Sequence, residues 1–179
     1  MLNTPTKIIV HHTGGTDAYP LMDTSHHTID DVRAWHLSKG WDDIGYHWFI
    51  NKAGDVDMGR PEDMHGAHCV GQNTKSIGIC LAGNFDATLP TPAQEDALKE
   101  LLGEIMERWN IPYAEIYPHR KFANKTCHGT KLNDNWASML MKPEVALPST
   151  CNGLHDKIEE QQSLINNLMG ILKKLLGFK

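Results

Sequence analysis

Apolar and polar residues follow the pattern of β-strands in three stretches of the chain. Residues 6–12 are apolar enough for a central strand, residues 44–51 form a second strand and residues 76–82 a third. A turn at residues 52–55 leads into residues 56–60, which predicts a hairpin with the second strand. These stretches predict a sheet in which residues 6–12 lie in the interior.

Two helix starts carry capping signals. Thr28, followed three residues later by Asp31, forms a variant of the capping box, and the helix that it begins is expected to end at Gly40. In Thr91-Pro92-Ala93-Gln94 the threonine is the cap, the proline lies in the first turn and the glutamine is the box partner. This second helix carries an apolar stripe as far as Trp109, and such a stripe belongs to a core.

The last part of the chain has a different pattern. Residues 143–151 contain prolines and small residues, which predicts a linker. Residues 152–179 repeat apolar positions every three and four residues, with acidic residues early and lysines late, which predicts a C-terminal amphipathic helix. Three interpretations stay open: a helix docked on its own domain, a homo-oligomer formed through this helix, or contact of the helix with a membrane surface.

Length, charge and cysteine usage bound the function. A chain of 179 residues is long enough for one domain with a sizeable core, and the formal charge of −5 argues against nucleic acid as a partner. No apolar run reaches the length of a membrane span. The stretch Met1-Leu2-Asn3-Thr4-Pro5 lacks the features of a secretory signal, so we expect synthesis in a cytoplasm. The 4 cysteines are too few and too scattered for a disulfide framework.

Candidate metal ligands occur at two distant places. His119 and Cys127 flank a short loop, and the strand of residues 6–12 runs into His11 and His12. An imidazole from a strand end, with an imidazole and a thiolate from a late loop, would make a zinc site of three protein ligands, which leaves the fourth position for water as in catalytic sites. Alternation places His11 and His12 on opposite faces of the strand, and this argument does not decide which of them faces the metal.

A series of short motifs continues in order along the chain. It runs through Val10-His11, Trp35-His36, Gly40-Trp41, Asp43-Ile44-Gly45-Tyr46-His47-Trp48-Phe49-Ile50, Gly59-Arg60, Gly66-Ala67-His68, Gly71-Gln72-Asn73 and Ser76-Ile77-Gly78-Ile79-Cys80-Leu81. This order resembles the type 2 N-acetylmuramoyl-L-alanine amidase family, which contains the phage lysozyme-type amidases and the peptidoglycan recognition proteins. The similarity covers roughly residues 6–140, and the number of ordered motifs makes it specific.

The resemblance implies a fold and a cofactor. The fold would be α/β, a central mixed β-sheet flanked by helices, with a zinc amidase domain at residues 1–142 and the metal in a surface groove. The ligands of Zn²⁺ would be His11, His119 and Cys127. Zinc lowers the pKa of a bound water to about 7, which provides a nucleophile near neutral pH.

The resemblance also implies roles for residues around the metal. Tyr46 and Lys125 would be catalytic, and Lys125 is suited to stabilise the oxyanion that forms when the amide carbonyl is attacked. Removal of one such donor can cost about a hundred- to thousand-fold in rate. His36, His68 and Asn73 would bind the muropeptide. The sequence shows no carboxylate that stands out as a dedicated base, so the route of the proton to the leaving amine stays open.

We therefore expect a zinc-dependent N-acetylmuramoyl-L-alanine amidase that cuts the bond between muramic acid and the L-alanine of the stem peptide in peptidoglycan. The resemblance and the start of the chain suggest a phage endolysin, made in the host cytoplasm and acting at the cell wall after the membrane has been permeabilised. The alternative is a non-catalytic peptidoglycan-binding module, which the presence of Cys127 disfavours. A regulatory binding role is a third alternative, for which the sequence offers no test.

Overall fold

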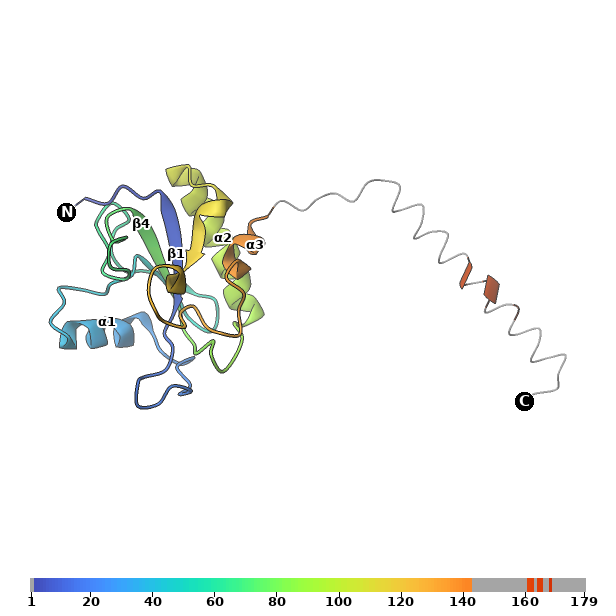
Figure 1. Ribbon diagram of the computed structural model, residues 1–179, viewed down its shortest axis with the longest axis horizontal. Helices are drawn as coiled ribbons and strands as arrows, with labels where there is room; N and C mark the ends of the chain where they lie inside the picture. The colour runs from blue at the N-terminus through green and yellow to red at the C-terminus, as the bar shows by residue number, and fades with distance from the viewer. Residues whose placement is uncertain (1, 143–160, 163, 166–167, 169–179) are drawn as a thin grey trace. The chain divides into compact units, whose positions relative to one another are not determined.

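The chain divides into two units, Met1–Lys142 and Pro143–Lys179. The computed structural model describes residues 2–142 of the first unit and, in the second, residues 161–162, 164–165 and 168. The first unit holds the whole sheet, its helices and every candidate site residue (Figure 1).

Five strands form one mixed sheet in the order β3-β2-β4-β1-β5. The strands are β1 Lys7–His12, β2 Trp48–Ile50, β3 Val56–Met58, β4 Ser76–Leu81 and β5 Ile116–Pro118. Strand β1 pairs in parallel with both β4 and β5, β2 pairs in parallel with β4, and only the β2–β3 pair is antiparallel among the described strands. The predicted mixed sheet, its central first strand and the hairpin are therefore confirmed.

Strand β2 is shorter than the predicted stretch of residues 44–51. Side chains occupy the backbone groups that a longer ladder would use: Arg60 Nε donates to the Ile44 carbonyl at 2.5 Å. The Gly45 N–H donates to His36 Nδ1 at 3.0 Å. Because the side chains of Arg60 and His36 satisfy these backbone groups, residues 44 and 45 do not extend the strand.

Within the described residues 2–142, three α-helices flank the sheet: α1 Ile29–Ser38, α2 Pro92–Trp109 and α3 Trp136–Leu140. Short 3₁₀ turns occupy Tyr113–Glu115 and His119–Lys121. Thr28 and Thr91 cap α1 and α2 through complete capping boxes with Asp31 and Gln94, as the sequence predicts. Gly40, just past the end of α1, has a φ of +82°, a conformation that glycine adopts without strain.

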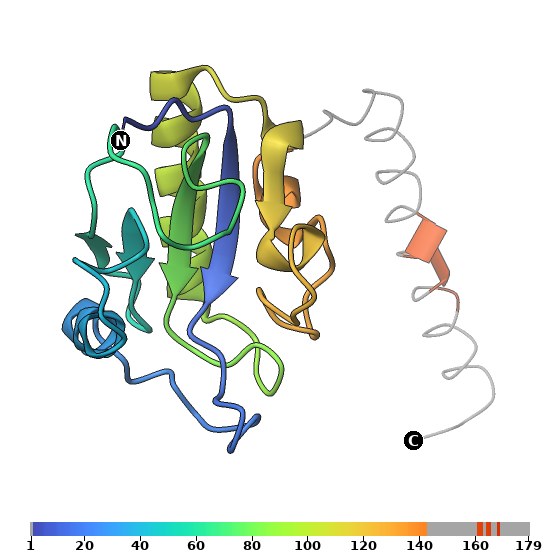
Figure 2. The ribbon, with the colours of Figure 1, turned by 60° about the vertical axis from the view of Figure 1, so that its left-hand side comes forward.

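The two faces of the sheet are covered differently. Helix α2 packs on one face against a core of aliphatic side chains from β1, β2 and β4, behind the sheet in the view of Figure 2. A smaller cluster on the other face joins Val32 of α1 to Ile44, Phe49, Cys80 and Ala82. Because β-strand side chains alternate, β1 directs Val10 toward α2 and His11 toward the α1 side.

The described residues of the second unit are helical and exposed: Gln161, Gln162, Leu164, Ile165 and Leu168. The predicted linker at residues 143–151 and the rest of the predicted helix at residues 152–179 lie outside the described residues, and both stay predictions. In the part of the chain that the structure describes, no helix combines the length and the apolar character needed to cross a bilayer.

Candidate metal centre

Three donor side chains from distant parts of the chain meet on the α1 side of the sheet. His11 lies near the end of β1, His119 follows β5 directly, and Cys127 lies in the loop beyond it. One donor atom from each residue lies within 4.8 Å of the other two. Of the residues that the structure describes, these form the one group of three or more histidine, cysteine or acidic side chains with this property.

The geometry of this group fits a tetrahedral metal. Zinc–nitrogen and zinc–sulfur bonds of normal length place adjacent nitrogen and sulfur ligands about 3.6 Å apart. Cys127 Sγ lies 3.6 Å from His11 Nδ1. Two imidazoles and a thiolate also form a ligand set that binds zinc in preference to hard cations such as Mg²⁺.

The protonation states of the three donors also favour a bound metal ion. Burial, reinforced by the nearby rings of His68 and His119, holds the pKa of His11 well below its ordinary value. Burial, followed by the charge of Lys125, lowers the pKa of His119 to about 4. Burial raises the pKa of the Cys127 thiol to about 12. Both rings therefore keep free lone pairs, and the thiol ionises readily only when a cation such as a metal compensates its charge.

His12 has a different place from His11. Its Nδ1 accepts the Phe85 N–H at 2.9 Å, and its ring lies on the α2 side of the strand near the Phe85 ring. This bond supports the backbone after β4, whereas His11 faces the donor group. The alternation of a β-strand separates the two neighbours, as expected.

Two charged side chains hold the loop that carries Cys127. The carboxylate of Asp86 accepts the Thr126 hydroxyl at 2.7 Å and the Thr130 N–H at 2.7 Å. The guanidinium of Arg120 donates to the Gly129 and Leu132 carbonyls, at 2.6 Å each. Backbone groups on both sides of the cysteine are therefore fixed by side chains outside the donor group.

Tyr46 lies beside the donor group. Its ring centroid is 5.0 Å from that of His11 and 5.5 Å from that of His36. Burial, with smaller contributions from the Cys80 and Cys127 sulfurs, raises the pKa of Tyr46 well above its ordinary value. The phenol therefore keeps its proton and can donate a hydrogen bond.

Lys125 is an exposed residue of the loop between His119 and Cys127. Its positive charge helps to lower the pKa of His119, and at Cys127 it opposes the rise in pKa that burial causes. The ammonium group therefore acts electrostatically on the donor group while its side chain stays open to solvent. This combination suits a group that meets a substrate rather than one that supports the fold.

His36 is buried and forms a wall next to Tyr46. Its Nδ1 accepts the Gly45 N–H at 3.0 Å, and its ring stacks on Trp41 with centroids 4.4 Å apart and planes 23° apart. Trp41 exposes 38% of its surface beside this wall, whereas the ring of Trp35, 53% exposed, is covered on one face by Lys39 Nζ at 3.2 Å. Flat aromatic faces of this kind pack well against the apolar surfaces of a ligand.

His68 and Asn73, the other predicted substrate contacts, are occupied by the protein itself. His68 is 8% exposed, and its Nδ1 lies 3.0 Å from His11 Nε2. The Asn73 side-chain oxygen accepts the N–H groups of His68 and Cys69, at 2.9 and 2.8 Å. The structure thus brings His68 to the donor group, whereas Asn73 acts on the loop that carries His68.

Two residues near the centre had no sequence signal for a role there. Ser76 begins β4 and contacts His68, but a serine at the start of a strand carries no distinctive pattern. The sequence favours a small apolar role for Cys80, yet its buried sulfur contributes to the raised pKa of Tyr46. Alternation places Ser76 and Cys80 on the same face of β4, but the register that pairs Cys80 with His11 is visible only in the structure.

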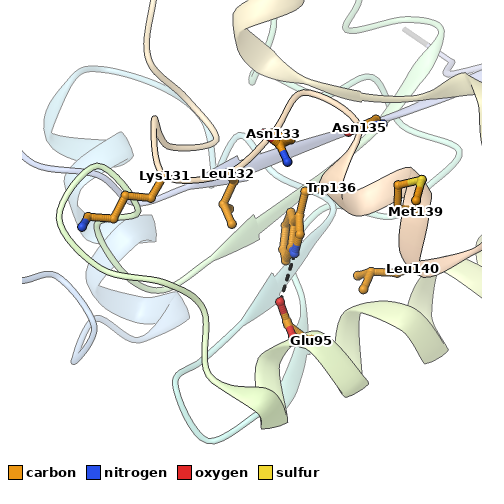
Figure 3. A pocket seen from close by; sticks show the side chains of 8 residues that line it. All are labelled: Glu95, Lys131, Leu132, Asn133, Asn135, Trp136, Met139 and Leu140. Atoms are coloured by element: carbon orange, nitrogen blue, oxygen red, sulfur yellow. Dashed lines mark hydrogen bonds between the residues drawn. The ribbon is translucent and has the colours of Figure 1, made fainter.

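A separate pocket of about 490 Å³ lies between α2 and α3 (Figure 3). It is lined by Glu95, Lys131, Leu132, Asn133, Asn135, Trp136, Met139 and Leu140. Trp136 Nε1 donates to the Glu95 carboxylate at 3.0 Å across it. None of the metal-donor residues lines this pocket, and its internal hydrogen bond marks it as part of the packing of α3 on α2.

Comparison with known proteins agrees with this fold. The model of the N-acetylmuramoyl-L-alanine amidase family matches residues 1–130. The endolysin of Klebsiella phage KP32 is 37% identical over 60% of this chain and 74% of its own, and peptidoglycan-recognition protein SC2 of Drosophila melanogaster is 37% identical over 69% and 68%. The solved structure of the N-acetylmuramoyl-L-alanine amidase LysC from Clostridium intestinale matches with a TM-score of 0.64 and 30% identity, covering 74% of this chain and 83% of that one.

The mixed sheet, with its donor group at the ends of β1 and β5, defines the amidase and peptidoglycan-recognition class of fold. The chain belongs to the N-acetylmuramoyl-L-alanine amidase family, and its activity is that of an N-acetylmuramoyl-L-alanine amidase. The predicted family, fold class and enzymatic activity are thereby confirmed.

Proposed function

We propose that this amidase depends on zinc held by His11, His119 and Cys127, and that it cleaves the amide between muramic acid and L-alanine in peptidoglycan. The observation that carries the proposal is the convergence of the three donor atoms within 4.8 Å of one another. The neutral state of both imidazoles and the sulfur–nitrogen distance support zinc as the ion. When bound, zinc supplies an activated water and polarises the amide carbonyl.

The residues around the ion would handle charge and position. Tyr46 keeps its phenolic proton beside His11 and would donate a hydrogen bond to the reacting carbonyl, a role that its raised pKa and its contact with the His11 ring support. Lys125 brings a positive charge near His119 and Cys127, where negative charge develops on the carbonyl oxygen. The partly exposed ring of Trp41, next to His36, offers a surface on which a sugar ring can pack.

We further propose that the protein is a phage endolysin that reaches the wall from the host cytoplasm once the membrane is opened. The relatives named endolysins, from Klebsiella phage KP32 and other phages, support this role. Peptidoglycan as the substrate is supported by the recognition proteins of the same fold, one of which is described in complex with tracheal cytotoxin.

The bond that is cut identifies the reaction. Purified peptidoglycan digested by the protein should yield stem peptides with new free L-alanine amino termini, detected by mass spectrometry. Removal of zinc with a chelator should abolish these products, and added zinc should restore them. Products with new reducing sugar ends and intact muramoyl peptides would contradict the proposed bond.

The ligand set is tested by substitution. Cys127→Ala should keep the fold, because its loop is held by Asp86 and Arg120, but it should lose zinc and amidase activity together. Cys69→Ala is the matched control, since Cys69 is a buried cysteine outside the donor group. Full activity of the Cys127→Ala protein without zinc would rule out the proposed site.

A further inference from the structure

A chain of hydrogen-bonded groups lies behind His11, on the side away from Cys127. His11 Nε2 is 3.0 Å from His68 Nδ1. The other ring nitrogen of His68 lies 3.4 Å from Ser76 Oγ, and that hydroxyl donates to the Gln72 carbonyl at 2.8 Å. His11, His68 and Ser76 are all buried, so the chain is shielded from bulk solvent.

The Gln72 carbonyl, at the end of this series of hydrogen bonds, determines which group donates in each of them. A serine hydroxyl has one proton, and a carbonyl can only accept, so the Ser76 proton is directed at Gln72. The Ser76 oxygen therefore accepts, and the proton between it and His68 belongs to the ring, on Nε2. A neutral imidazole carries a single N–H. His68 Nδ1 is then an acceptor, and the proton that it accepts belongs to His11 Nε2.

We propose that this chain fixes the tautomer of His11, and that His68 and Ser76 are positioning residues for the metal rather than substrate contacts. With its proton on Nε2, His11 presents the Nδ1 lone pair on the side of Cys127 Sγ. In the opposite tautomer, His11 would carry its proton on Nδ1 and direct this N–H at the metal position. His68 would then donate from Nδ1, and the lone pair of its Nε2 would face the lone pair of Ser76 Oγ. The inference rests on the proposed function for the identity of the metal site and adds what orients its first ligand.

The packing around His68 holds the ring in this chain. A Cβ on Gly66 would lie 2.4 Å from His68 Cδ2, and one on Gly78 would lie 2.5 Å from His68 Cγ. Neither glycine has a positive φ, so the absence of a side chain serves space rather than backbone conformation. Asn73 fixes the backbone of the same residue by accepting the His68 N–H. The ring therefore has one place, between two glycines and against His11.

Metal affinity tests the link between His68 and the ion. His68→Phe keeps the ring shape but removes the acceptor, and we expect its dissociation constant for zinc to rise about ten- to a hundredfold. His68→Asn places an amide oxygen near the position of Nδ1 and should recover much of this loss. Ser76→Ala, one bond further away, should weaken zinc binding about two- to tenfold, the worth of one neutral hydrogen bond.

His65→Phe is the matched control for these variants, because His65 lies in the same loop and its ring contacts the Gly66 carbonyl. Its zinc affinity should equal that of the wild type. Each variant is measured by competition with a chromophoric chelator, after circular dichroism has shown that it is folded. Equal zinc affinity of the wild type, His68→Phe and Ser76→Ala would overturn the proposal.

The tautomer itself is read from ring ¹⁵N chemical shifts of the metal-free protein. In the wild type, His11 should carry its proton on Nε2 alone, and in Ser76→Ala and His68→Phe both tautomers should appear. An unchanged single tautomer in both variants would also overturn the proposal. A wild type with the fixed tautomer and tight zinc binding, but without amidase products, would instead count against the proposed function and leave the positioning role standing.

Discussion

The two faces of the central sheet are built from neighbouring residues of the same strands, yet only one of them carries the cluster of histidines beside a smaller apolar core. Along β4, Ile77, Ile79 and Leu81 pack toward α2 in a fully buried aliphatic core. The intervening residues, Ser76, Gly78 and Cys80, face the side of His11 and His68. Neighbouring residues of β4 therefore alternate between packing against α2 and facing the candidate site.

This difference shows how one strand can serve both purposes. The α2 face gains stability from the volume of its side chains, whereas the other face needs space, because the His68 ring occupies the room above Gly78. Substitutions on the first face should change the free energy of unfolding and leave the chemistry intact. Substitutions of the polar residues around His11 on the second face should change the chemistry more than the free energy of unfolding.

The strongest test of the packing face is Leu102→Ala. Leu102 is fully buried in the α2 core, so the cavity should lower the free energy of unfolding by about 2–5 kcal/mol. Zinc affinity of the folded protein should not change. Urea unfolding followed by circular dichroism measures the loss, with Leu89→Ala as control because Leu89 is 62% exposed. Equal stability of the two variants would contradict the assignment of this face.

The strongest test of the chemical face, apart from the metal ligands, is Lys125→Met. The rate of peptidoglycan hydrolysis should fall about a hundred- to thousand-fold, because one stabilising charge is lost. Its free energy of unfolding should stay within about 0.5 kcal/mol of the wild type, since the side chain is exposed.

Lys121→Met is the control for this variant. Lys121 lies in the same region, but its ammonium group sits over the Tyr117 ring at 3.7 Å. Its loss should leave the hydrolysis rate near that of the wild type. A Lys121→Met protein as slow as Lys125→Met would show that general charge, rather than the position of Lys125, sets the rate.

Glu62 joins the two faces, because it connects the loop that carries His68 to α2. Its carboxylate accepts the indole N–H groups of Trp48 and Trp109 and pairs with Arg108 at 2.7 Å. Burial raises the pKa of Glu62, but hydrogen bonds from Trp109, Arg108 and Trp48 outweigh burial and hold this pKa below its ordinary value. Glu62→Gln should lower the free energy of unfolding by about 1–3 kcal/mol at neutral pH.

The same carboxylate predicts a pH dependence. A lowered pKa in the folded state gives a stabilisation that is complete above the unfolded-state pKa of about 4.3 and is lost as the pH falls through the folded-state pKa. Below about pH 4.3 the stability of the wild type should therefore approach that of Glu62→Gln. Denaturation at several pH values measures this, with the exposed Glu100→Gln as control. A stability difference that stays constant down to pH 2 would contradict the assignment.

Removal of residues 152–179 should have the smallest effect on the amidase unit, and its main effect should be on self-association. If this segment self-associates, sedimentation should give a larger mass for the full chain than for a 1–148 truncation, beyond the mass removed. Monomeric masses for both proteins would remove the homo-oligomer prediction. Binding of the full chain, but not of the truncation, to anionic vesicles would favour membrane contact instead.

Local signals in the sequence predicted much of the fold. The boxes at Thr28 and Thr91 act within a few residues, so the sequence alone reveals them. Strand β1 follows from its apolar run, and the hairpin follows from the turn at residues 52–55. The length of β2 could not be predicted, because it depends on Arg60 and His36, side chains that reach the backbone from elsewhere in the chain.

The candidate site was predictable in residue type but not in every contact. Alternation separates His11 from His12, but the choice between them depends on which face α2 covers, a tertiary fact. The resemblance supplied that choice. The contacts of His68 and Asn73 with the protein could not be foreseen, because they depend on how the loop of residues 61–74 folds back onto β4.

Asp86 and Arg120 fix the loop around Cys127 from outside the donor group, and this has a consequence for how the ion arrives. Two of the donors are already set by neighbouring strands, and the third is held by bonds that need no ion. Uptake of the proposed zinc would then require only desolvation and ligand exchange, with no folding step. The rate of loading should therefore be proportional to free zinc and indifferent to mild denaturant, and the emptied protein should survive repeated cycles of stripping and refilling.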